Sequence, residues 1–146
     1  MIRSLTKDHA LAGVRIGYAL GEPRLLSALG RILAPWGVSV VAQAAAAAAL
    51  QNPAPYRAAI DALWAERQRL TAGVAALGFT VEPGQAPFFL VQVEDARRIA
   101  AQLLDAGIVV RDCTSFGLPN HIRISPQRPE AGDRLLAALA AVAASR

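Results

Sequence analysis

The chain has 146 residues, of which 54% are hydrophobic and 18% are charged, with a single cysteine and a formal net charge of +4. This composition excludes an intrinsically disordered protein, and one cysteine excludes a fold held by internal disulfides. The arginines are scattered apart from the pair Arg97–Arg98, with few aromatic residues beside them, which argues against a nucleic-acid partner. The polar start of the chain lacks a signal-peptide pattern, so we expect a globular protein of the cytoplasm.

The first third of the chain predicts a short strand followed by two helices. Residues 13–20, GVRIGYAL, form a β-like run between glycines. Pro23 suits the first turn of a helix, and the apolar spacing continues to about residue 33. Ser39 is expected to cap an alanine-rich helix that runs to about Leu50.

One segment raises the question of a membrane span. Ile32–Leu50 contains no charged residue over nineteen positions, which is about the length of a transmembrane helix. Pro35 and Gly37 interrupt it, however, and its many alanines contribute little hydrophobic free energy. We therefore expect a helix of a soluble protein that is buried on most of its faces, and no membrane partner.

The rest of the chain predicts a long helix and a small α/β unit. Apolar residues recur at three, four and seven positions from Tyr56 to Leu77, and Gly78 suits a left-handed helix end. Helices are expected after Asp95 and in the last 17 or so residues. Strands are expected over 79–82, 88–93, 108–112 and 121–125. We thus predict an α/β fold with residues 1–52, a connecting helix over 53–77, and a small domain over 78–146.

Lys7 is the only lysine of the chain. Lysine can lose its proton and attack a carbonyl, whereas arginine stays charged. Alone, this lysine is better explained as a mobile surface residue. Ser4 and Arg15 add a hydroxyl and a guanidinium that both suit a phosphate, and Gly13 and Gly17 allow close packing around the arginine. Together these residues are what an aldehyde cofactor with a phosphate tail requires.

The sequence SLTK followed by LAGVRIGYALG resembles the cofactor-lysine signature of class I/II, fold-type I pyridoxal-phosphate enzymes. The resemblance implies that Lys7 binds pyridoxal 5'-phosphate covalently and is the catalytic residue, while Ser4 and Arg15 hold the cofactor phosphate. It also implies the C-terminal portion of the PLP-dependent transferase fold. Serine acylation, the other use of S-x-x-K, requires S-D-N and K-T-G elements that this sequence lacks.

Residues 109–130, VVRDCTSFGLPNHIRISPQRPE, resemble the histidinol-phosphate aminotransferase branch of that family. More narrowly, they resemble the threonine-phosphate decarboxylases of cobalamin biosynthesis, with the aminotransferase as the alternative. By this resemblance Arg123 binds the substrate carboxylate, and the substrate is an amino acid, phosphorylated or not. Arg111 is interpreted as an ion pair with Asp112 or as a contact to a substrate phosphate.

Other chemistry-bearing residues predict no further site. Cys113 is expected to be a packed small residue, and Trp36 and Trp64 are expected to pack. His9 and His121 lie beside the proposed site residues without the spacing of a metal site. No metal is therefore predicted.

The resemblance covers nearly the whole chain but only about the C-terminal half of the family fold. Family members place an aspartate on the pyridine nitrogen, and that residue comes from the half that precedes the lysine. A poor electron sink would result without it, so we expect this chain alone to be a weak catalyst or none. It is interpreted as a fragment, as half of a split enzyme whose partner chain supplies the rest, or as a noncatalytic remnant. The family implies a homodimer.

Overall fold

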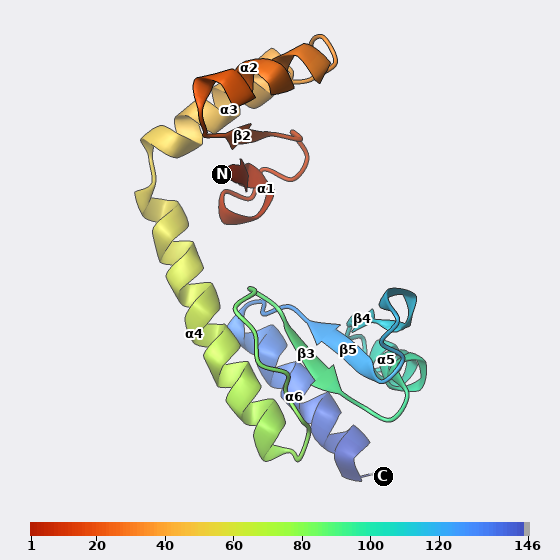
Figure 1. Cartoon of the computed structure of the whole chain (residues 1–146). Coiled ribbons are helices and arrows are strands. Elements are labelled where there is room, and N and C mark those ends of the chain that lie inside the picture. Colours follow the sequence, from red (N-terminus) through yellow and green to blue (C-terminus); the bar gives the residue numbers. More distant parts are fainter. Residues whose placement is uncertain (145–146) are drawn as a thin grey trace. The chain divides into compact units, whose positions relative to one another are not determined.

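The computed structural model describes residues 1–144 of a chain that divides into two compact units, Met1–Ile60 and Asp61–Arg146. Figure 1 shows the elements of both units. The first unit contains β1 (Ile2–Ser4), α1 (Leu5–Asp8), β2 (Gly17–Ala19), α2 (Pro23–Ile32), α3 (Val40–Gln51) and the start of α4 (Ala54–Ala76). The second unit contains the rest of α4, then β3 (Phe89–Gln92), α5 (Ala96–Asp105), β4 (Arg111–Asp112), the 3₁₀ turn η1 (Thr114–Phe116), β5 (His121–Ile124) and α6 (Pro129–Ala144).

In the first unit β1 and β2 form an antiparallel ribbon, with Ser4 opposite Gly17. Glycine is required at position 17 because a Cβ there would lie 2.6 Å from the Arg3 carbonyl oxygen. The strand expected over residues 13–20 is shorter than predicted. The backbone turns before β2, where Arg15 has a φ of 53°, so only the last part of the run is extended.

The two helices that follow begin at the predicted residues. Pro23 occupies the first turn of α2, and the Glu22 carboxylate accepts a hydrogen bond from the Leu25 amide at 3.2 Å. The Ser39 hydroxyl accepts one from the Ala42 amide at 3.1 Å, so Ser39 caps α3 as expected.

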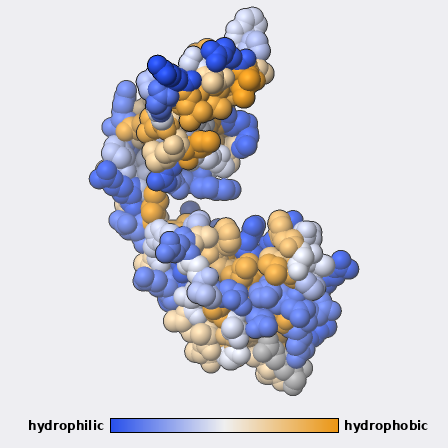
Figure 2. Space-filling view, in the orientation of Figure 1, coloured by the Kyte–Doolittle hydropathy of each residue, from blue (hydrophilic) through white to orange (hydrophobic). Residues whose placement is uncertain are grey.

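The prediction that most faces of α3 are buried is wrong for this chain by itself. Only one stripe of α3 is buried, formed by Ala42, Ala46 and Ala49, while Val40 is 80% exposed. Trp36, which was expected to pack, is 96% exposed. Figure 2 shows hydrophobic side chains on the visible surface of this unit. Across residues 1–144, no helix combines the length and the apolar character that a membrane span needs.

In the second unit a three-stranded antiparallel sheet has the order β3-β5-β4. Alternate side chains of β5 point to opposite faces: Ile122 and Ile124 are buried, and Arg123 lies on the other face. Helices α4, α5 and α6 cover the apolar face and close one core (Figure 1). That core is made of Leu70, Val74, Phe79, Phe89, Val91, Val93, Ala96, Ile99, Leu103, Ile122, Ile124, Leu135, Leu139 and Val142.

Helix ends in the second unit agree with the sequence signals. Gly78, just after α4, has a φ of +84°, and Asp95 caps α5 by accepting hydrogen bonds from the Arg97 and Arg98 amides. Two predicted strands are much shorter than expected: residues 79–82 contribute one bridge, Val81 to Val91, and 108–112 contribute only β4. The result is an α/β layer with one covered and one open sheet face.

Candidate functional site

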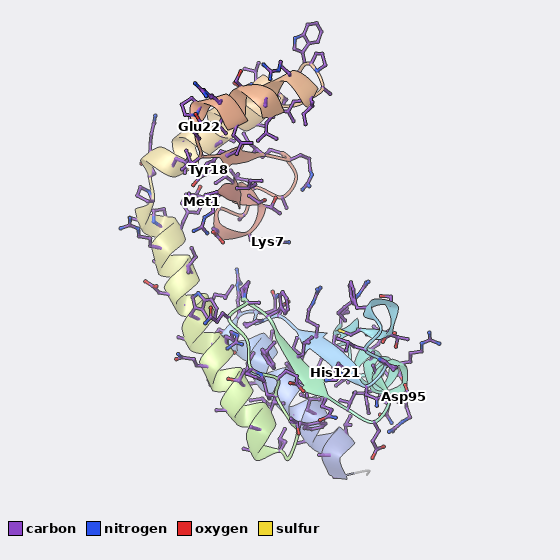
Figure 3. The ribbon with its side chains drawn as sticks, in the orientation of Figure 1. Met1, Lys7, Tyr18, Glu22, Asp95 and His121 are labelled. Atoms are coloured by element: carbon purple, nitrogen blue, oxygen red, sulfur yellow. The ribbon has the colours of Figure 1, made fainter. Side chains whose placement is uncertain are left out.

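Lys7 lies on the short helix α1 and its side chain is exposed. Figure 3 shows it extending away from the helix. The helix begins directly after Ser4, whose hydroxyl oxygen accepts a hydrogen bond from the Thr6 amide at 3.2 Å. Because Ser4 also ends β1, the strand and the cap together fix the backbone from which Lys7 projects.

Arg15 is held in an uncommon backbone conformation close to Ser4 in space. Its φ of 53° lies in the left-handed region, which non-glycine residues rarely adopt and which concentrates at functional positions. Its guanidinium Nη1 donates a hydrogen bond to the Ala12 carbonyl at 2.9 Å, and this bond stabilises the turn and fixes the side chain. The glycines differ in role. Gly17 packs tightly, whereas a Cβ at Gly13 would meet nothing within 4 Å, so the close packing expected there is absent.

Ser4 and Arg15 both line one open hollow in the first unit, with a volume of about 400 Å³. Thr6 and Arg3 line the same hollow, and no carboxylate does among its lining residues. With Tyr18, three hydroxyls and two guanidiniums line the hollow without a competing acid, a set that fits a phosphate dianion. Lys7, on the helix that follows Ser4, is not among the lining residues.

Arg123 belongs to the second unit and lies on the open face of the sheet. Its guanidinium carbon is 5.0 Å from the centre of the Phe88 ring. Its Nε is buried and has no hydrogen-bond partner among the described residues. No carboxylate within residues 1–144 forms an ion pair with it. The side chain is thus a cation whose hydrogen-bond donors are left for a ligand.

Arg111 lies directly opposite Arg123 in the pairing of β4 with β5. Residues opposite each other project to the same sheet face, and like charges placed this way repel each other. The Arg111 guanidinium lies 5.3 Å from the centre of the Phe116 ring. The expected ion pair of Arg111 with Asp112 does not form, because the Asp112 carboxylate pairs instead with Arg97, at 3.9 Å. Two arginines without an ion-pair partner among residues 1–144 therefore share the open face.

The remaining titratable groups are accounted for by local contacts. Hydrogen bonds from the Thr114 hydroxyl and amide lower the pKa of the Asp112 carboxyl, with help from Arg97 and Arg111. Burial raises the pKa of the Cys113 thiol, which is packed as expected. His121 Nε2 is 3.4 Å from the Glu82 carboxylate, and the His9 ring lies 4.8 Å from the Tyr56 ring at a tilt of 46°. In the part of the chain that the structure describes, no cluster of ligating side chains could hold a metal.

The sequence-predicted residues thus fall into two groups. Ser4, Lys7 and Arg15 lie together in the first unit, and Arg123 lies in the second. Phe88 also lies on the open face, and the sequence analysis placed it in a strand without predicting this position. The available signal was the doublet of Phe88 and Phe89, because adjacent strand residues point to opposite faces and only one of them can enter the core.

Comparison with known proteins assigns the family. The family model described as "Aminotransferase class I and II" matches residues 1–139. An aromatic amino acid aminotransferase of Mycobacterium marinum is 40% identical over 137 residues, which are 93% of this chain and 37% of the relative. Histidinol-phosphate aminotransferase 2 of Ralstonia nicotianae is 38% identical over 141 residues, which are 94% of this chain and 38% of the relative.

Solved structures agree with that assignment. The histidinol-phosphate aminotransferase of Sinorhizobium meliloti, in complex with pyridoxal-5'-phosphate, matches with a TM-score of 0.86 and 33% identity, over 99% of this chain and 40% of that chain. The L-threonine-O-3-phosphate decarboxylase of Porphyromonas gingivalis matches with a TM-score of 0.79 and 26% identity, over 95% of this chain and 45% of that one. The predicted α/β fold, as a portion of the PLP-dependent transferase fold, is confirmed.

The chain spans less than half the length of these relatives. Within that span the match runs from the lysine segment of the first unit through the strand that carries Arg123. The chain therefore belongs to the class I and II aminotransferase family, whose cofactor is pyridoxal 5'-phosphate.

Proposed function

We propose that this chain supplies the cofactor-lysine segment and the substrate-carboxylate site of a PLP-dependent aminotransferase that acts on an amino acid. The observation that carries the proposal is the hollow of the first unit, where Ser4 and Arg15 converge beside the helix of the only lysine. The proposal keeps the three-part organisation of residues 1–52, 53–77 and 78–146. It also keeps a homodimer, or a partner chain, as the assembled form.

In this proposal each residue of the first unit has one task. The Ser4 hydroxyl and the Arg15 guanidinium hold the cofactor phosphate as charge-assisted hydrogen-bond donors. The Lys7 amine would hold the cofactor through its aldehyde and would be the group that moves a proton at the substrate Cα. When bound, the cofactor supplies an electron sink for the charge that develops at that carbon.

Arg123 has the substrate-binding task. A planar guanidinium matches a carboxylate through two parallel hydrogen bonds, and Arg123 has no protein carboxylate among residues 1–144 to occupy it. Holding the α-carboxylate fixes which bond at Cα is aligned for cleavage. Arg123 therefore orients the substrate, while Lys7 moves the proton.

The open sheet face favours a substrate with a phosphate group. Arg111 is opposite Arg123, and a phosphate between or beside them would offset the repulsion of the two cations. Histidinol phosphate, named by two of the curated relatives, carries a phosphate and no carboxylate, so in such a substrate the phosphate would take the place of the carboxylate at Arg123. We therefore place a phosphorylated amine or amino acid ahead of an aromatic amino acid.

Decarboxylation of a phosphorylated amino acid is the second candidate. It is supported by the run RDCTSFGLP at 111–119 and by the structural match to a threonine-phosphate decarboxylase. The curated relatives with higher identity are aminotransferases, which is why transamination comes first.

The test is a titration of the purified chain with pyridoxal 5'-phosphate, followed by visible absorbance. We expect a saturable absorbance change that Arg15→Ala weakens about tenfold or more, because a charge-assisted hydrogen bond contributes about 1.5–3 kcal/mol. The matched control is Arg24→Ala, which removes an exposed arginine of the same unit and should bind normally. Equal weakening by both variants, or by neither, would contradict the proposal.

A further inference from the structure

Phe88 is a large aromatic residue whose position is not explained by the core. It directly precedes β3, and its neighbour Phe89 is 2% exposed inside the core cluster. Phe88 is 36% exposed. Because successive strand side chains alternate, Phe88 lies on the open face while Phe89 lies on the covered one.

The register places Phe88 next to Arg123. Phe89 pairs with Ile124 and Leu90 pairs with Arg123, so Phe88 is diagonal to the arginine on the same face. Diagonal neighbours are within reach when one is aromatic and the other is long. The 5.0 Å between the Arg123 Cζ and the ring centre is a stacking distance.

Arg123 has no other anchor at its charged end within the described residues. Its Nε is buried without a hydrogen-bond partner, and no ion pair fixes the guanidinium. A long arginine side chain has many rotamers, and an unfixed one would lose conformational entropy when it binds a ligand. The Phe88 ring is the contact that restricts those rotamers before any ligand arrives.

We infer that Phe88 is a positioning residue for Arg123, holding the plane of the guanidinium so that its donors face a carboxylate. The inference rests on the proposed substrate-binding role of Arg123. Phe88 is not proposed to contact the substrate itself. By positioning Arg123, it increases the affinity of that arginine for a carboxylate.

The test uses the full chain with ¹⁵N-labelled arginine and acetate as the carboxylate probe, with chloride keeping the ionic strength constant. The side-chain Nε–H signal of Arg123, assigned by its loss in Arg123→Lys, is followed as acetate is added. We expect a saturable shift whose apparent dissociation constant rises about two- to fivefold in Phe88→Leu, the effect of losing one cation–π contact. Phe88→Tyr keeps the ring and should stay within about twofold of the parent.

Two controls separate positioning from stability. Phe116→Leu removes the other stacked ring, beneath Arg111, and should leave the acetate dissociation constant at Arg123 unchanged. Without acetate, rotation of the Arg123 guanidinium about its Nε–Cζ bond should be slow in the parent and in Phe88→Tyr, and fast in Phe88→Leu. Thermal unfolding of each variant identifies any that does not fold, and Phe88→Met then replaces Phe88→Leu.

The outcomes distinguish the two claims. An unchanged acetate affinity and an unchanged rotation rate in Phe88→Leu would overturn the positioning role while leaving Arg123 as the carboxylate site. An Arg123 signal that does not respond to acetate in the parent chain would overturn the carboxylate site, and the role of Phe88 with it.

Discussion

The two units of this chain differ in how they use their apolar residues. The second unit closes a continuous core between one sheet face and three helices. In the first unit the buried hydrophobic residues are Leu5 and three alanines of α3, while Ile32, Leu33 and Trp36 are exposed. The segment that we propose to bind the cofactor therefore lies on the unit with less apolar burial of its own. This contrast indicates that the second unit carries most of the stability of the chain.

The largest expected effect is a core deletion in the second unit. Ile122→Ala removes a fully buried side chain between the sheet and the helices, so we expect the free energy of unfolding to fall by about 2–5 kcal/mol. Trp36→Ala in the first unit removes a side chain that is 96% exposed, so it should change the free energy of unfolding by no more than about 0.5 kcal/mol. Urea unfolding of both variants measures the two changes. Comparable losses of unfolding free energy would contradict the claim that the second unit carries most of the stability.

A smaller effect is expected where α4 and α6 meet. A Cβ at Gly132 would collide with the Glu66 carboxylate and lie 2.7 Å from the Arg69 guanidinium, which binds that carboxylate. Gly132→Ala should therefore cost about 1–3 kcal/mol of unfolding free energy. Gly84→Ala, where a Cβ meets nothing within 4 Å, is the control and should be close to neutral. Equal melting temperatures for the two variants would show that the contact between these helices is looser than described.

The pH dependence of stability is expected to depend on Asp112. Hydrogen bonds from Thr114 hold its pKa below the ordinary 3.8 in the folded state. The unfolded state therefore takes up its proton first, and this stabilisation is present above about pH 4 and lost as the pH falls through the lowered pKa. Thr114→Ala should flatten that loss. The measurement is the urea midpoint of the parent and of Thr114→Ala from about pH 5 down to about pH 2. The same pH dependence in both would show that Asp112 does not cause the loss of stability.

The smallest effect compares two nucleophiles in the native chain. Cys113 is 2% exposed and burial raises the pKa of its thiol, so we expect it to react slowly with a disulfide reagent until urea is added. Lys7, which is exposed in the first unit, should be acylated by a succinimidyl ester without urea. Fast labelling of Cys113 in native buffer would contradict the closed core of the second unit.

Local sequence signals predicted much of the second unit. Gly78, the Asp95 cap and the alternation of β5 each depend on neighbours a few residues away, and each is found as expected. Strand lengths were predicted less well, because pairing decides them: residues 79–82 contribute only the Val81 bridge. The exposure of Trp36 could not be predicted either, since an apolar residue carries no local mark of whether a partner surface covers it.

The candidate site shows the same limit. The spacing of Ser4, Lys7 and Arg15 predicted a site that suits an aldehyde cofactor with a phosphate tail, to which the family resemblance added pyridoxal 5'-phosphate. It could not show that Ser4 and Arg15 line one hollow, because that depends on the pairing of β1 with β2 and on the left-handed turn at Arg15. The stacking of Phe88 on Arg123 likewise requires the β3–β5 register.

The central claim is that the only lysine of the chain carries the cofactor. The most direct measurement is borohydride reduction of the chain with pyridoxal 5'-phosphate, followed by peptide mapping of the reduced adduct. The competing amine is that of Met1, which donates a hydrogen bond to the Leu20 carbonyl at 2.7 Å. We predict an adduct on Lys7 that decreases strongly in Arg15→Ala and persists in Arg24→Ala. An adduct confined to Met1, or one on Lys7 that is indifferent to Arg15, would contradict the claim.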